Sequence, residues 1–341
     1  MGNFGYRLPD GAELVSHSGD EILMTVSMPT DDDGFFGRQC PDCSQLFRID
    51  ADDYEALPDD LQLCCVYCGY LADHGEFITQ QQLDRAKRAL GDYGVQMIGQ
   101  QLDGIFSRLA RSSRSRHSGF SKLPVRAAVL ARAAAWDHEE RLIRIRTCAG
   151  CSLRYAVFAD HRFCPRCGQL PAKAVAEDAL AAETARLDAL AQIPEQAAAV
   201  LREQGAFDRM LADTLSNAVG IVETSAGTAF RAAVPNATQL LQGKGNIFQR
   251  LDHAADLFVT AGYPDLRTLV DAATWQRLPE TWAKRHVFIH NDGLVDTKYL
   301  TKVPTSTSQI GQRLAVTESE CRQVITDTRA LCTAIAAILG L

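Results

Sequence analysis

Apolar residues in the C-terminal part of the chain recur every three or four positions, the spacing that places side chains on one face of an α-helix. The last of these runs begins at Thr317, which matches a capping box with Glu320. An antiparallel helical bundle with its own core is therefore expected over residues 195–341. The positions that define its helix faces are Phe207, Leu211, Leu215, Val222, Ile247, Leu251, Ala254, Phe258, Leu266, Leu269, Val270, Ala273, Val324, Thr328, Leu331, Ile335 and Ile338.

Two more segments precede this bundle and follow the same helical pattern. Residues 80–111 carry an apolar face that three glycines weaken, and residues 174–192 are rich in alanine and glutamate. The second segment ends before Pro194, and we expect it to be a helical connector over residues 173–194. A strand pattern, with β-branched and aromatic residues, is found at residues 153–158.

The chain contains 11 cysteines, and eight of them form four Cys-x-x-Cys pairs. In a reducing compartment such pairs are metal ligands more often than disulfides, because one tight turn presents two thiolates to the same ion. Two pairs supply the four ligands of a tetrahedral site, so two structural Zn²⁺ ions are expected. A redox dithiol and an iron–sulfur cluster are the alternatives. The pairs are Cys40 and Cys43, Cys65 and Cys68, Cys148 and Cys151, and Cys164 and Cys167.

The cysteine pairs at residues 148–151 and 164–167 are close together in the sequence, with 12 residues between them. Gly168 follows the last cysteine, where a glycine readily adopts the positive φ that turns backbone N–H groups toward sulfur. Over about 25 residues this arrangement resembles a rubredoxin-type zinc ribbon.

The first cysteine set is looser, because 21 residues separate Cys43 from Cys65. Cys64 adjoins Cys65 and competes with it as a ligand, although only Cys65 gives the two-residue spacing of the pair.

These patterns together predict a mainly α fold class, in which two small β zinc ribbons and helical connectors precede a C-terminal helical bundle. The expected segments are an N-terminal segment with the first ribbon at residues 1–78, a helical segment with a basic loop at 79–140, the second ribbon at 141–172, the connector at 173–194 and the helical domain at 195–341.

The composition of the 341 residues, with 46% hydrophobic and 23% charged, is typical of a globular protein and excludes a largely disordered or collagen-like chain. No run of about 18 apolar residues is present, and residues 1–10 lack the pattern of a secretory signal. We therefore expect a cytoplasmic protein without a membrane partner. The net charge of −7 repels phosphate, so contact with nucleic acid requires a local basic patch.

Residues 104–136 form such a patch, since they contain no acidic residue and are rich in serine between 112 and 121. A flexible cationic loop is a candidate phosphate contact for RNA. A solvated loop beside an acidic neighbour is the alternative. The candidate RNA-binding residues are Arg111, Arg114, Arg116, Lys122 and Arg126.

Near residue 285 the helical pattern carries residues suited to chemistry. Arg285, His286 and His290 fall within six positions and precede Asn291-Asp292-Gly293, a strong helix stop. On an ideal helix Arg285 and His290 lie about 140° apart. They converge only if the helix ends near His290, or if two copies meet in a symmetric dimer.

This segment resembles the Arg-x(4–6)-His signature of HEPN domains, all-helical domains common in bacterial toxin–antitoxin and antiphage systems. The matching residues are Arg285-His286-x-x-x-His290, with the continuation Asn291-Asp292-Gly293-Leu294-Val295-Asp296-x-x-Tyr299-Leu300. The resemblance covers roughly residues 194–341. It implies a metal-independent endoribonuclease that acts as a homodimer with both motifs facing one cleft, and an inhibitor or defence-system partner that restrains it. The zinc ribbons would then recognise substrate or partner.

The three residues suit this chemistry independently of the resemblance. A histidine can take the proton of a 2′-OH or protonate the departing 5′-oxygen, and arginine can bind the nonbridging phosphate oxygens. The alternatives are that Arg285 and His290 only cap the helix end and that His286 is a packed residue. At the level of function, the alternatives are a domain that binds RNA or a nucleotide without cutting it, and a protein-docking regulator.

One glycine-rich segment, Gln242-Gly243-Lys244-Gly245, lacks the layout of a P-loop. We expect it to be a loop before a helix at Asn246.

Overall fold

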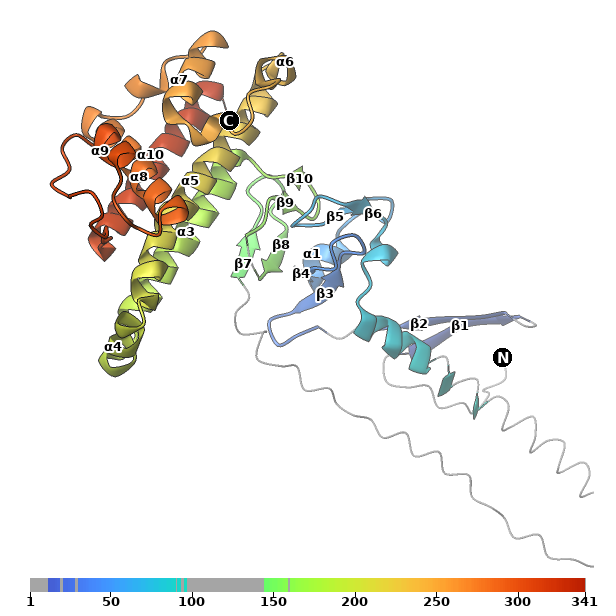
Figure 1. Cartoon of the computed structure of the whole chain (residues 1–341). Helices are drawn as coiled ribbons and strands as arrows, with labels where there is room; N and C mark the ends of the chain where they lie inside the picture. The colour runs from blue at the N-terminus through green and yellow to red at the C-terminus, as the bar shows by residue number, and fades with distance from the viewer. Residues whose placement is uncertain are drawn as a thin grey trace, which may run out of the picture. The chain divides into compact units, whose positions relative to one another are not determined.

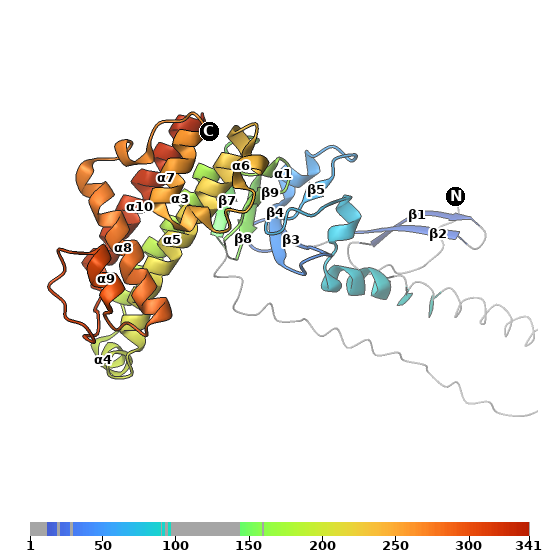
Figure 2. The ribbon, with the colours of Figure 1, turned by 45° about the horizontal axis from the view of Figure 1, so that its top comes forward.

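The computed structural model describes residues 12–18, 21–27, 30–89, 91–92, 95–96, 144–158 and 160–340. The chain divides into two compact units, residues 1–169 and residues 170–341. Figures 1 and 2 show short strands in the first unit and helices in the second. The expected fold class, mainly α with small N-terminal β elements, is confirmed.

Antiparallel strands pair in four small sheets within the described part of the first unit. Three of these sheets are two-stranded: β1 (Ala12–Ser18) with β2 (Glu21–Val26), β5 (Leu63–Cys64) with β6 (Leu71–Ala72), and β9 (Phe163–Cys164) with β10 (Gly168–Gln169). The fourth contains β3 (Phe35–Gln39), β4 (Leu46–Asp50), β8 (Arg154–Val157) and β7 (Arg144–Thr147) in the order β3-β4-β8-β7. A short helix, α1 (Ala51–Glu55), follows β4.

The four-stranded sheet joins the two cysteine-rich segments, which the sequence analysis assigned to separate ribbons. Strands β4 and β8 pair antiparallel, with Ile49 opposite Tyr155. An ion pair reinforces the junction, because Nη2 of Arg154 donates to Oδ1 of Asp50 at 2.6 Å. Residues 30–78 and 144–169 are therefore parts of one body.

An approximate internal two-fold symmetry relates these two segments. The strand order places β4 and β8 at the centre of the sheet, with β3 and β7 as equivalent edges. The N–H of Cys64 donates to the carbonyl of Pro165 at 2.8 Å, and in the equivalent contact the N–H of Phe163 donates to Val66 at 3.1 Å. The repeated cysteine pattern of the sequence thus corresponds to a repeated structure.

Aromatic side chains fill the interior of this unit. Phe47 of β4 and Phe77 of the 3₁₀ turn η1 (His74–Phe77) are fully buried, with ring centroids 5.8 Å apart. A helix begins at residue 80, where the apolar pattern predicts one. Its Gln82 holds it against β3, because Nε2 donates to the carbonyl of Gly37 at 2.8 Å.

Helices form all of the regular structure described in the second unit. Two long helices, α5 and α10, lie side by side with α3 in both views (Figures 1 and 2). The elements are α3 (Ala172–Ala191), α4 (Glu195–Glu203), α5 (Ala206–Ala233), α6 (Ala237–Leu241), η3 (Ile247–Gln249), α7 (Leu251–Thr260), η4 (Leu266–Thr268), α8 (Ala272–His290), α9 (Thr297–Lys302) and α10 (Glu318–Leu339).

Helix α3, which the sequence analysis expected as a connector, belongs to the core of this unit. Its Leu180 and Leu187 are fully buried and pack with Leu211 and Leu215 of α5. The physical reason is the seven-residue spacing of the two leucines, which gives α3 an apolar stripe long enough to cover a neighbouring helix.

Two helix starts show how local side chains set the boundaries. The capping box of Thr317 and Glu320 is present, and α10 begins where it predicts. The pattern over residues 266–273 is divided instead between η4 and α8, because Asp271 accepts the N–H of Thr274 at 2.9 Å and starts a new helix. None of the described helices combines the length and apolar character that crossing a bilayer requires.

Candidate functional site

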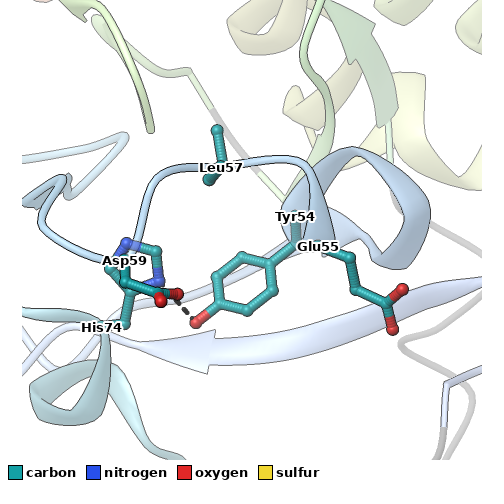
Figure 3. Close-up of a pocket in the computed structure, with 5 residues that line it drawn as sticks. All are labelled: Tyr54, Glu55, Leu57, Asp59 and His74. Atoms are coloured by element: carbon teal, nitrogen blue, oxygen red, sulfur yellow. Dashed lines mark hydrogen bonds between the residues drawn. The ribbon is translucent and has the colours of Figure 1, made fainter.

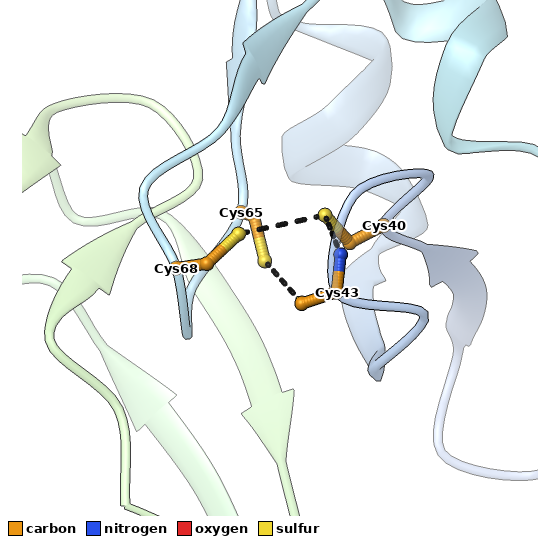
Figure 4. A group of neighbouring side chains, drawn as sticks. All are labelled: Cys40, Cys43, Cys65 and Cys68. Atoms are coloured by element: carbon orange, nitrogen blue, oxygen red, sulfur yellow. Dashed lines mark hydrogen bonds between the residues drawn. The ribbon is translucent and has the colours of Figure 1, made fainter.

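The first group of cysteines brings four sulfur atoms together from two tight turns. Cys40 and Cys43 lie between β3 and β4, and Cys65 and Cys68 lie between β5 and β6 (Figure 4). Two Sγ–Sγ distances are 3.6 Å, for Cys40 and Cys68, and 3.7 Å, for Cys43 and Cys65. Sulfurs about 2.3 Å from a zinc ion at tetrahedral angles are roughly 3.8 Å apart. The spacing is therefore compatible with a zinc site.

The second group has the same geometry. The Sγ atoms of Cys151 and Cys164 are 3.6 Å apart, and those of Cys148 and Cys167 are 4.0 Å apart. In each group all four sulfurs lie within 4.8 Å of one another. The cysteines of the sequence prediction are thus assembled as two Cys₄ groups, which are compatible with two zinc sites.

The residue after each second cysteine has a left-handed backbone conformation. Its φ is 60° at Ser44, 79° at Gly69, 61° at Ser152 and 74° at Gly168. The turn is closed by the same hydrogen bond in three cases, where this residue donates its N–H to the carbonyl of the first cysteine; an example is Ser44 to Cys40 at 2.9 Å. All four pairs therefore share one turn geometry, which the sequence signalled only by its two glycines.

Burial sets the protonation of the innermost thiols when no metal is bound. It raises the pKa of Cys65 and of Cys164, which are both fully buried. Metal binding must then displace protons from these thiols, so that metal affinity falls as the pH falls.

Cys64 is not a member of the first group. It lies in β5, is 2% exposed, and its thiol faces the carbonyl of Cys65 at 3.7 Å. Burial raises the pKa of Cys64 to about 11. The spacing argument that preferred Cys65 is confirmed. Cys321 and Cys332 lie on the buried face of α10.

In the second unit, helix α8 ends at His290, where the Asn-Asp-Gly pattern predicts a stop. The N–H groups of Asn291 and Gly293 both donate to the carbonyl of Val287, at 2.9 and 3.1 Å. The two residues that turn the chain, Asp292 and Gly293, have φ of 49° and 76°. This double hydrogen bond is the C-terminal capping arrangement that fixes the direction of the chain after a helix.

The end of α8 forms one wall of a cavity of about 580 Å³. The segment at residues 243–250, which includes η3, helix α9 and Val219 of α5 complete the lining. Arg285, His286 and His290 all line this cavity, so the structure brings together the three residues that the sequence analysis selected. Its basic and histidine residues are Lys244, Arg250, Arg285, His286, His290, Lys298 and Lys302.

The cavity is cationic and its charges are not balanced locally. No carboxylate lines it in the described part of the chain. Two carboxylates lie near its edge: Asp296 accepts the N–H of Tyr299 at 2.7 Å, and Glu223 accepts from Gln249 of the lining at 2.6 Å. A concave surface with charges of one sign concentrates ligands of the opposite sign. The cavity therefore favours an anionic ligand.

His286 lies beside Lys298 and His290 in this lining. Its Nε2 is 3.2 Å from Nζ of Lys298, and its ring centroid is 4.7 Å from that of His290. Burial lowers the pKa of His286, and the positive charges of Lys298, His290 and Lys302 lower it further, while Asp296 opposes them. The neutral imidazole, which can accept a proton, is therefore favoured.

Two buried polar atoms of the lining have no hydrogen-bond partner in the part of the chain that the structure describes. Nε of Arg285 and the indole Nε1 of Trp282 make no hydrogen bond with any described residue. Arg285 and His290 make no side-chain hydrogen bond to the carbonyls at the end of α8 within the described ranges, although His290 lies in the last turn of α8, where a positive charge interacts favourably with the helix dipole. Buried donors without acceptors are costly, and an anion in the cavity would supply acceptors.

No family model, curated protein or solved structure matches this chain. The resemblance to HEPN domains therefore stays a prediction from residues 285–300. Arguments about function rest on the geometry of the cavity and of the two cysteine groups.

Two groups of residues remain. The first was predicted but lies outside the described residues, and the second lines the cavity but was not predicted. Arg111, Arg114, Arg116, Lys122 and Arg126 lie outside the described residues. Lys298 and Lys302 were not predicted from the sequence, although their spacing of four places them on one face of α9 directly after the motif. Lys244 and Arg250 were also not predicted, since no spacing rule connects that loop to α8.

A second cavity, of about 400 Å³, lies in the first unit (Figure 3). Oη of Tyr54 and Nδ1 of His74 are 2.7 Å apart at its edge. Its described lining contains the carboxylates of Glu55 and Asp59 and neither lysine nor arginine. It is therefore unsuited to a phosphate.

Proposed function

We propose that this chain is an endoribonuclease whose reaction takes place in the cavity at the end of α8. The observation that carries the proposal is that Arg285, His286 and His290 line one cationic cavity without a carboxylate. Such a lining combines two groups for proton transfer with cations for a phosphate. The resemblance of residues 285–300 to HEPN domains supports the same activity.

In the proposed reaction, the substrate displaces Nζ of Lys298 from Nε2 of neutral His286. This nitrogen then accepts the proton of a 2′-OH, and the resulting oxygen attacks the adjacent phosphorus. Arg285 donates hydrogen bonds to the nonbridging oxygens, on which negative charge increases in the transition state. His290 donates a proton to the departing 5′-oxygen. The P–O5′ bond breaks as the new P–O2′ bond forms, and the products carry a 2′,3′-cyclic phosphate and a 5′-OH.

We propose that this reaction proceeds without a divalent ion in the cavity. Mg²⁺ is held in proteins by carboxylate oxygens, and the described lining has none. In this proposal Lys298 and Lys302 supply the positive charge that a metal ion would otherwise provide to the phosphate.

The test is cleavage of RNA by the full-length protein in EDTA, with analysis of the product ends. We expect cyclic phosphate and 5′-OH ends. His290→Ala should lower kcat/KM about 100-fold or more, through loss of proton transfer, and Arg285→Ala should do the same through loss of charge stabilisation. His286→Ala should cause a similar loss as the second proton-transfer group.

His253→Ala is the matched control, because His253 is an exposed histidine of α7 outside the cavity lining. It should cleave at the rate of the wild type. If the RNA is bound but stays intact, and Arg285→Ala only weakens binding, the domain binds RNA without cutting it. The proposed nuclease activity would then be wrong.

We also propose that each Cys₄ group binds one structural zinc ion. Four thiolates close the coordination sphere and leave no position for substrate, so the role is in folding. Elemental analysis of the reduced protein should give two zinc ions per chain, and Cys40→Ser and Cys164→Ser should each remove one. A ratio of one or zero in the wild type would contradict the proposal.

The resemblance further supports a homodimer, and a restraining partner from a defence system. Sedimentation of the full-length protein at micromolar concentration should give twice the mass of one chain. A monomer that cleaves RNA would show that one copy is sufficient for catalysis.

A further inference from the structure

The lining of the cavity carries more positive charge than one phosphate can neutralise. Five of its side chains are permanent cations, namely Lys244, Arg250, Arg285, Lys298 and Lys302. A phosphodiester carries one negative charge. The volume of about 580 Å³ is more than one phosphate group occupies. The ligand that matches this cavity has several phosphates.

These cations come from two places that are remote from each other in the sequence. Arg285 lies on α8, with Lys298 and Lys302 on the adjacent α9, whereas Lys244 and Arg250 belong to the loop between α6 and α7. The proposed chemistry uses the α8 side. It leaves the loop without a role.

The loop has the features of an anion-binding segment. Gly243 and Gly245 have φ of 71° and 52°, which only glycine adopts without strain. The N–H groups of Gly243, Gly245 and Asn246 donate to no acceptor among the described residues. The N–H of Lys244 donates to the carbonyl of Leu241 at 3.1 Å, so the adjacent free N–H groups are those of Gly245 and Asn246. Adjacent free N–H groups in such a turn attract anions.

A side-chain contact holds the loop in this conformation. Nη2 of Arg250 donates to the carbonyl of Lys244 at 3.0 Å. The lysine side chain makes no ion pair with a described residue, so its charge is available to a ligand.

We propose that the Gly243-Lys244-Gly245 loop is a second phosphate subsite, which binds a phosphate of the RNA strand next to the one that is cleaved. This inference rests on the proposed function, since it names the substrate of the same cavity: a strand segment with at least two phosphates. Lys244 binds the second phosphate and Arg250 positions the loop.

Three short substrates separate the subsite from the catalytic centre. They are a dinucleotide with one internal phosphate, the same dinucleotide with an added 5′-phosphate, and the same dinucleotide with an added 3′-phosphate. For the wild type, one of the two added phosphates should lower KM about tenfold, the value of one charged hydrogen-bonded contact. Lys244→Gln should remove that gain, so that its effect on KM is much larger for the substrate with the favoured added phosphate than for the unmodified dinucleotide. Lys173→Gln, an exposed lysine of α3, is the matched control.

Binding provides a readout that does not depend on cleavage. The Kd of 2′-deoxy analogues, which lack the attacking hydroxyl, should show the same tenfold gain in the wild type and its loss in Lys244→Gln. The proposal is overturned if neither phosphate tightens binding, if Lys244→Gln weakens all three ligands equally, or if a nucleoside triphosphate binds more tightly than every dinucleotide. If the ligands bind with the expected pattern but the ribonucleotides are not cleaved, the proposed nuclease activity is wrong and the proposed phosphate subsite still holds.

Discussion

Ser44 and Ser152 occupy backbone conformations in which a side chain is disfavoured. Their φ values of 60° and 61° match those of the glycines at the equivalent turns, so the serines carry strain that the glycines avoid. The four turns therefore allow the stability of serine and of glycine to be compared in the same backbone conformation.

Ser152→Gly should stabilise the first unit by about 0.5–1 kcal/mol. The change relieves about 1–2 kcal/mol of left-handed strain and costs roughly 0.5–1 kcal/mol of backbone entropy. Urea unfolding of the zinc-loaded protein measures the difference. Gly168→Ala should lower the free energy of unfolding. Its added methyl group has no other atom within 4 Å, so the substitution only introduces left-handed backbone strain. Gly69→Ala should lower the free energy of unfolding further, because the ring of Phe163 lies 2.7 Å from the added carbon.

The charge of Lys298 should lower the pH at which His286, the proposed base, becomes active. Lys298→Gln removes a positive charge 3.2 Å from His286 and should raise the pKa of His286 toward its usual value. A base is active when neutral, so activity is lost as the pH falls through this pKa. The acidic limb of the kcat/KM profile should therefore move to higher pH in the variant.

An NMR titration of the His286 ring gives the same pKa without catalysis. Lys173→Gln should leave the titration unchanged. An unaltered His286 titration in Lys298→Gln would show that the charge of Lys298 does not reach the imidazole.

Between elements, the main polar connection of α8 is to α10. Asp327 of α10 is 2% exposed and accepts from Nε and Nη2 of Arg277 on α8, at 2.7 and 2.6 Å. It also accepts from Gln323 at 2.9 Å. This buried carboxylate holds α8, and with it one wall of the cavity, against α10.

Asp327→Ala should lower the free energy of unfolding of the helical unit by about 2–3 kcal/mol. Breaking a buried pair costs about 3–5 kcal/mol, and solvent around the half-exposed Arg277 reduces this value. Asp327→Asn, which keeps the shape, should lose less. Glu195→Ala breaks the exposed pair with Arg202 and should change stability by less than about 0.5 kcal/mol, as thermal unfolding can measure.

The sequence predicted elements whose determinants are local. The capping box at Thr317, the stop after His290 and the cysteine pairs each depend on neighbouring residues, and each is found where it was predicted. The pairing of β4 with β8 and the approach of the Lys244 loop to α8 depend on tertiary contacts. No periodicity or spacing in one sequence encodes such contacts, and they were missed.

For the whole molecule, the division into two compact units implies two separate unfolding transitions. Each unit has its own core, one built around Phe47 and Phe77 and the other around the α3, α5 and α10 helices. The cysteine groups both belong to the first unit. Loss of metal should therefore affect one unit only.

Cys164→Ser should abolish the transition of the first unit and leave the helical signal at 222 nm to melt at its original temperature. Leu215→Ala should do the reverse: it removes a fully buried leucine of α5, costs about 2–5 kcal/mol, and leaves the zinc content unchanged. Calorimetry with parallel zinc analysis distinguishes the two. If Cys164→Ser also lowers the helical transition, the two units are energetically coupled.

The shared sheet also constrains the order of events during synthesis. Arg154 meets Asp50, 104 positions earlier, so the central strand pair cannot form until the second ribbon has left the ribosome. Until then β4 presents an unpaired strand edge beside apolar Phe47 and Ile49, the kind of edge through which nascent chains aggregate. A message truncated before residue 154 would encode a fragment with that edge permanently open. Such fragments should depend on chaperones or be degraded, even though they contain a complete first set of cysteines.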